Sequence, residues 1–131
     1  MQDTRYGKVR DLPGLSYDEA VERVTEALSE EGFGVLTEID VREKMREKLG
    51  EEFRRYVILG ACAPELAHRA LQEEDAIGLL LPCNVVVAEA DDGAQAAYLR
   101  PRQMMAFAGN DALTPVAEEA EERIARAFDR L

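Results

Sequence analysis

Apolar and polar positions in the first third of the chain follow first a helical and then a strand period. Between Ser16 and Gly32, six apolar residues recur at three- and four-residue steps and form one helical stripe: Tyr17, Ala20, Val21, Val24, Ala27 and Leu28. Ser16 and Glu19 make a capping box at the start of this helix, and Gly32 ends it. The flanking segments, Tyr6 to Leu12 and Phe33 to Glu38, predict a strand on each side.

The middle of the chain predicts two helices separated by a buried strand. Asp40 repeats the capping pattern and starts a short, charged surface helix that ends at Gly50. The segment Tyr56 to Ala61 is rich in β-branched and aromatic residues and predicts a buried strand. Pro64 suits the first turn of the next helix, whose apolar face is supplied by Leu66, Ala67, Ala70 and Leu71.

The following segment predicts a β-hairpin. Leu79 to Glu89 has the composition of a strand, with Pro82 entering or bulging it. Asp91-Asp92-Gly93 is a hairpin turn signal, so Gln95 to Arg100 should pair back antiparallel to that strand.

The last quarter predicts mainly helix. Pro101 to Phe107 is compatible with a short helix or a loop, and Thr114-Pro115 is expected to cap a final helix. The glutamates of its first turns (Glu118, Glu119, Glu121 and Glu122) are expected on a solvated face. Together, the elements indicate an α+β fold in which helices cover one face of a mainly antiparallel sheet.

Composition limits the partners. The 131 residues, 47% apolar and 33% charged, suit one folded domain over residues 1–131. A net charge of -11 argues against nucleic acid or an anionic membrane as a partner. No secretory signal is visible, and the apolar run from Ile77 to Ala90 is too short and interrupted to span a bilayer. We therefore expect a cytoplasmic protein, whose two cysteines stay reduced thiols.

The clearest candidate for chemistry is Cys62, which follows a strand and precedes the helix at Pro64. Unpaired N–H groups and the positive end of the helix dipole would lower the pKa of its thiol. His68, one turn into the same helix, would approach a ligand held at the helix start. The alternative is that Cys62 is a buried packing residue and His68 a solvated one.

Cys83 and Asn84 interrupt an apolar stretch and are the second candidate. A polar Asn84 in a buried strand must either fix a loop or face a pocket. If Cys62 and Cys83 project from neighbouring strand ends, they would converge with His68 at one edge of the sheet. Such a set suits zinc, although the chain lacks the Cys-x-x-Cys pair of most structural zinc sites.

Four ordered blocks of sequence resemble domain of unknown function family 302. They are Glu31 to Asp40 (EGFGVLTEID), Tyr56 to Cys62 (YVILGAC), Leu66 to Leu71 (LAHRAL) and Ile77 to Val87 (IGLLLPCNVVV). The resemblance runs from about Ser16 to the C-terminus. It implies a strand, a helix, four strands and a helix, similar to the TATA-binding-protein-like arrangement, often as a dimer. It implies no established activity.

Two functional hypotheses follow from these residues. The first is a homodimeric binding module that holds a small molecule or a metal in a pocket near Cys62, His68, Cys83 and Asn84. The second is a thiol-dependent enzyme or redox protein that uses Cys62, with His68 as a base. No base, orienting group and oxyanion donor can be assembled from the sequence, which favours the binding module.

Overall fold

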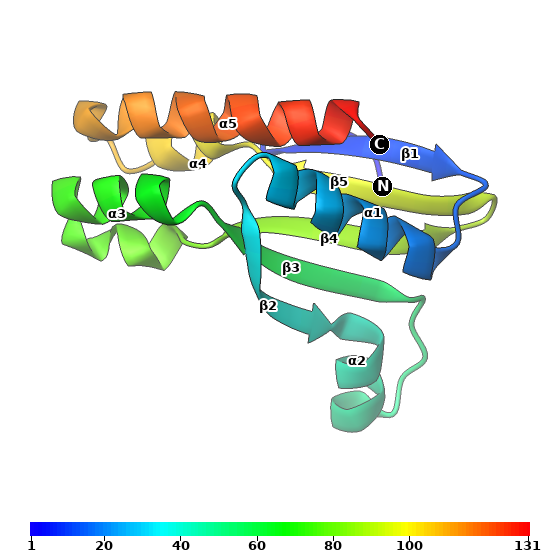
Figure 1. Cartoon of the computed structure of the whole chain (residues 1–131). Helices are drawn as coiled ribbons and strands as arrows, with labels where there is room; N and C mark the ends of the chain where they lie inside the picture. The colour runs from blue at the N-terminus through cyan, green and yellow to red at the C-terminus, as the bar shows by residue number, and fades with distance from the viewer.

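The computed structural model describes residues 1–131 and is built around a five-stranded antiparallel sheet (Figure 1). The strands lie in the order β1-β5-β4-β3-β2. The strands are β1 (Gly7–Pro13), β2 (Gly34–Asp40), β3 (Tyr56–Cys62), β4 (Cys83–Ala90) and β5 (Gly93–Leu99). The helices are α1 (Tyr17–Glu30), α2 (Val41–Leu49), α3 (Pro64–Glu73), α4 (Pro101–Ala106) and α5 (Thr114–Asp129). The predicted α+β fold is confirmed, and β1, α1, β2 to β5 and α5 follow the expected order of strand, helix, four strands and helix.

Local signals in the sequence determine where the first two helices begin and end. Ser16 and Glu19 form both bonds of the predicted capping box at the start of α1. Asp40 accepts a bond from the Glu43 backbone N–H at the start of α2. Gly50 ends α2 in the left-handed conformation, where a side chain would be strained.

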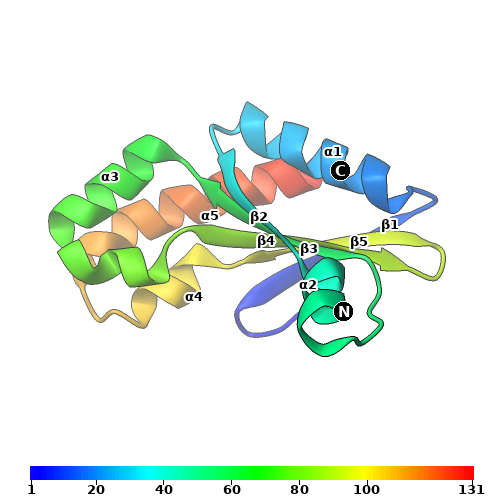
Figure 2. The ribbon, with the colours of Figure 1, turned by 90° about the horizontal axis from the view of Figure 1, so that it is seen from below.

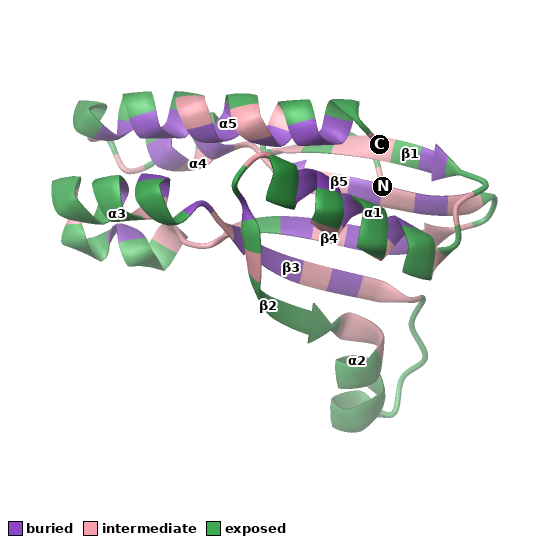
Figure 3. Ribbon diagram, viewed as in Figure 1, coloured by how far each residue is buried: buried purple, intermediate pink, exposed green.

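The core lies between the sheet and the two long helices, α1 and α5. Their apolar stripes face the sheet, while their outer faces are exposed (Figure 3). Alternate residues of the three central strands fill the same core, among them Leu59 of β3, Val85 and Val87 of β4, and Ala96 of β5, all fully buried. This alternation buries one face of the sheet, as the period-two pattern requires.

The other face of the sheet carries no long helix (Figure 2). The intervening residues of the strands point to it, and the strand registers align five apolar residues in a row across the sheet. In strand order the row is Val9, Ala97, Val86, Ile58 and Ile39. At either side of this open face lie the N-terminal segment, residues 1–6, and α2, which has no buried residue (Figures 1 and 2).

The predicted strand from Leu79 to Glu89 is wrong in its first part. Asp75 to Leu80 form a 3₁₀ helix instead, and β4 begins only at Cys83. Pro82, which follows a cis peptide bond, has no N–H to donate to a strand ladder. Pairing with β3 therefore starts directly after it, with Cys83 opposite Ala61.

The final helix also differs from prediction in its cap and in one glutamate. Thr114 is the first residue of α5 and not its cap, since the preceding residue, Leu113, is the N-cap and offers no side-chain bond. Glu121 is buried, where a solvated position was expected. Its Oε1 accepts a 3.0 Å bond from the backbone N–H of Arg102 and so satisfies the first turn of α4. The segment from Pro101 to Phe107, compatible with a short helix or a loop, thus forms a helix over Pro101–Ala106, and the buried carboxylate of Glu121 caps its start.

No helix combines the length and the apolar character needed to cross a bilayer.

Candidate functional site

The two cysteines lie together, as expected from their positions at neighbouring strand ends. Cys62 ends β3 and Cys83 begins β4, and both line a cavity under the first turns of α3. All twelve residues that line this cavity are hydrophobic, and its volume is about 20 Å³. A space of that size holds about one water molecule, so no organic ligand fits between the two thiols.

The predicted low pKa of Cys62 is wrong in direction. Burial, and secondarily the carboxylate of Glu65, raises the pKa of the Cys62 thiol above its ordinary value. Burial raises the pKa of Cys83 further, to about 11. Glu65 occupies the first turn of α3, so the position expected to favour a thiolate carries a negative charge instead. Both thiols are therefore protonated near neutral pH.

His68 and Asn84 do not join the cysteines. His68 is exposed on α3 and is absent from the lining of the cysteine cavity. Asn84 follows Cys83 in the same strand and so points to the opposite, open face of the sheet. No group of three or more His, Cys, Asp or Glu side chains is arranged to hold a metal ion. Cys62, Cys83 and His68 therefore do not form the zinc site that their sequence positions suggested.

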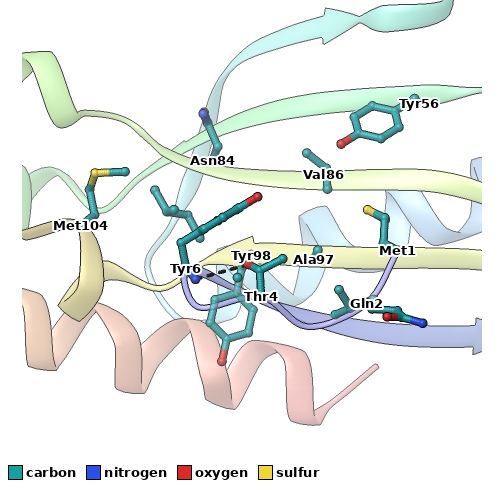
Figure 4. Close-up of a pocket in the computed structure, with 13 residues that line it drawn as sticks. Met1, Gln2, Thr4, Tyr6, Tyr56, Asn84, Val86, Ala97, Tyr98 and Met104 are labelled. Atoms are coloured by element: carbon teal, nitrogen blue, oxygen red, sulfur yellow. Dashed lines mark hydrogen bonds between the residues drawn. The ribbon is translucent and has the colours of Figure 1, made fainter.

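A much larger groove lies on the open face of the sheet, and Asn84 lines it (Figure 4). Its volume is about 640 Å³, within the range typical of small-molecule sites. Thirteen residues line it, nine of them hydrophobic: Met1, Gln2, Thr4, Tyr6, Gly7, Val9, Tyr56, Asn84, Val86, Ala97, Tyr98, Leu99 and Met104. None of the thirteen has a charged side chain, although one third of the chain is charged.

The floor and the sides of this groove come from different parts of the chain. Val86 and Ala97, neighbours in the apolar row, form the floor, with Met104 of α4 towards one end and Tyr56 of β3 towards the other (Figure 4). The N-terminal segment supplies Tyr6 along one side. The ring of Tyr98 points away from the groove and packs edge-on against Phe128 of α5, with ring centroids 4.7 Å apart.

Hydrogen bonds fasten the N-terminal segment beside the sheet. The side chain of Gln95 accepts from the Met1 ammonium at 2.9 Å and donates to the Met1 carbonyl at 3.2 Å. Asp3 accepts from the backbone N–H of Val9 and from Lys8, and these bonds lower the pKa of its carboxyl. The Tyr6 carbonyl accepts from the Arg100 N–H at 2.7 Å. The contacts with Gln95 and Arg100 thus join this side of the groove to residues far away in the sequence.

Sequence reasoning singled out Asn84 but missed the rest of this groove. One signal was present: the strand residues between the core positions, such as Ile58, Val86 and Ala97, are apolar where a solvated face would be polar. The contribution of residues 1–6 had no signal, because it depends on where the segment folds back. The groove therefore emerges only in three dimensions.

Comparisons with known proteins agree with this fold. The family model described as "Domain of unknown function DUF302" matches residues 9–131. The crystal structure of the uncharacterized conserved protein DUF302 from Bacillus stearothermophilus is 34% identical, with a TM-score of 0.87, and the match covers 97% of this chain and 98% of that one. None of the curated proteins compared with the chain matches it. With nearly its whole length matched in both sequence and structure, the chain belongs to the DUF302 family.

Proposed function

We propose that the protein is a binding module that holds a small molecule in the groove on the open face of its sheet. The observation that carries this proposal is the groove itself, about 640 Å³ in volume and mainly apolar, on a face that carries no long helix (Figure 2). Apolar pockets with a few polar groups are the usual form of small-molecule sites. The proposed binding site therefore lies on the face opposite to the one expected from Cys62 and Cys83. Asn84 is the one residue that belongs to both the expected site and the proposed one.

The alternative, a thiol-dependent enzyme, has less support. A nucleophilic cysteine needs a lowered pKa or an adjacent base. The pKa of Cys62 is raised, and the only histidine, His68, is exposed on α3 outside its cavity. Free, protonated thiols are also what a cytoplasmic protein would carry, and we propose that compartment for this one.

We propose further that the module is a homodimer formed through β2. This strand lies at the edge of the sheet, and six of its seven residues are exposed. Unpaired backbone groups on an exposed edge are a template for pairing with another strand. Leu36 and Ile39 of β2 are 65% and 46% exposed, and Ile39 ends the apolar row in which Val86 and Ala97 form the groove floor. A second copy would cover both side chains.

Binding can be tested with Nile red, an uncharged dye that fluoresces more strongly in apolar surroundings. We expect saturable binding to the protein and its loss in the variant Ala97→Arg, because the arginine would occupy the groove and place a charge among its apolar side chains. Leu79→Arg is the matched control, since Leu79 is 88% exposed and lies outside the groove. Equal binding by both variants, each with an unchanged Tm, would contradict the proposal.

A further inference from the structure

The groove contains an amide that has no partner in the chain. The side chain of Asn84 is exposed at the groove and makes no hydrogen bond to any other residue. Its carbonyl oxygen accepts and its NH₂ group donates, so it matches a ligand group that does both. In a site otherwise lined mostly by apolar side chains, one such group sets the orientation of a ligand. Asn84 is thus placed to recognise one polar group.

The side chains that line the groove include no charged group that would stabilise a charged ligand. An ion brought into an apolar groove loses hydration, and no lining side chain carries a compensating charge. The charges nearby either have a partner or line a different hollow. Gln95 holds the Met1 ammonium and Lys8 pairs with Asp3, while Arg54, 5.9 Å from the Tyr56 ring, lines another hollow with Glu89, Asp91 and Asp92. The net charge of -11 further repels anions.

The shape of the groove favours a flat ligand. Its floor is the surface of the sheet, where the small side chains of Ala97 and Val86 lie side by side. Larger side chains rise around this floor, with Tyr6, Tyr56 and Met104 at its margins (Figure 4). Aromatic rings and thioethers both make favourable contacts with an aromatic ligand.

From these three observations we infer that the ligand is an uncharged, flat, largely apolar molecule with one hydrogen-bonding group that pairs with Asn84. This inference rests on the proposed function and specifies its ligand class. It requires no movement of the fold, because the groove and the free amide are both present in the chain as it stands.

The class can be tested with naphthalenes that differ only in their beta substituent: a carboxamide, a carboxylate, an aminomethyl group (charged at neutral pH) or a methyl group. Their own fluorescence polarisation reports binding. We expect the carboxamide to bind about tenfold more tightly than either ion. Equal or tighter binding of an ion would overturn the ligand class while leaving the groove a binding site. Binding of none of the four would overturn the proposed function as well.

The role of Asn84 has its own variant. Asn84→Leu keeps the size of the side chain and removes its amide, so the carboxamide should lose about tenfold in affinity. The methyl compound, which makes no hydrogen bond, should bind unchanged, which shows that the groove persists. Gln72→Leu removes an exposed amide from α3, outside the groove, and should change neither affinity. A carboxamide that binds Asn84→Leu and the unaltered protein equally well would overturn the assignment.

Discussion

Gly60 shows how a single residue shapes the strand ends beside the groove. It lies in β3 opposite Thr37 of β2 and Asn84 of β4. A Cβ added to Gly60 would overlap the hydroxyl of Thr37 and would lie 2.8 Å from Cγ of Pro82. Glycine is therefore required because two neighbouring side chains occupy the space that its own would need.

Gly60→Ala should consequently destabilise the protein. We expect a loss of about 1–3 kcal/mol, since the clash must be relieved by moving Thr37 or the chain at Pro82. Urea unfolding followed by circular dichroism measures this loss. Gly34→Ala is the matched control in β2, because a Cβ there meets nothing within 4 Å. Equal stability of the two variants would contradict this account.

The cysteines provide a second prediction at the scale of residues. Because the pKa of both thiols is raised, each should react with iodoacetamide at pH 8 more slowly than free cysteine. Cys83, with a pKa of about 11, should be the slower of the two. Mass spectrometry of digests at timed intervals gives both rates. A Cys62 that reacts faster than free cysteine would restore the thiol-enzyme hypothesis.

At the scale of elements, an arginine–glutamate cluster links the C-terminal ends of the two long helices. Glu31, which follows α1, accepts from Arg126 of α5 at 2.9 Å and pairs with Arg130 just after that helix. The bond from Arg126 is the main cause that lowers the pKa of the Glu31 carboxyl, and Arg130 adds to it. A carboxylate with a lowered pKa stabilises the fold above its ordinary pKa.

The stability that Glu31 contributes should depend on pH in a defined direction. It is fully present above the ordinary pKa of 4.5 and is lost as pH falls through the lower value of the folded protein. Glu31→Gln should therefore lower Tm at pH 7, and this loss should shrink as pH falls below 4.5, as calorimetry would show. Glu30→Gln, which removes only a 3.6 Å pair with Arg130, should have a smaller effect at pH 7. A larger loss of Tm at pH 7 in Glu30→Gln than in Glu31→Gln would contradict the role given to the arginine–glutamate cluster.

At the scale of the whole molecule, the proposed dimer predicts the molar mass of the protein in solution and how that mass depends on salt concentration. Light scattering at micromolar concentration should give twice the chain mass of 14.6 kDa. Two copies with a charge of -11 each repel one another, so the dimer should strengthen between low and physiological salt. Ile39→Lys places a charge on the edge strand and should yield monomers. A monomer for the unaltered protein at every salt concentration would rule out the dimer.

The identity and order of most elements could be predicted from the residues alone, because the signals for them are local. The capping box at Ser16, the turn at Gly93 and the stripes of α1 and α5 each depend on residues a few positions apart. One-sided coverage of the sheet followed from the same patterns. The segment Asp75 to Leu80 escaped prediction because a short apolar run suits a strand and a buried helical turn equally.

The position of the candidate site depends instead on how distant elements pack against one another. The cysteines meet as expected, yet twelve hydrophobic neighbours from several elements close the space around them to about 20 Å³. The burial of Glu121 and the direction of the Cys62 pKa likewise depend on groups that are distant or placed by packing. The groove needs four strands in register, β1, β5, β4 and β3, and the return of residues 1–6 beside them. The volume of a cavity and the solvent exposure of its side chains depend on which elements pack together, and a local sequence pattern does not specify this packing.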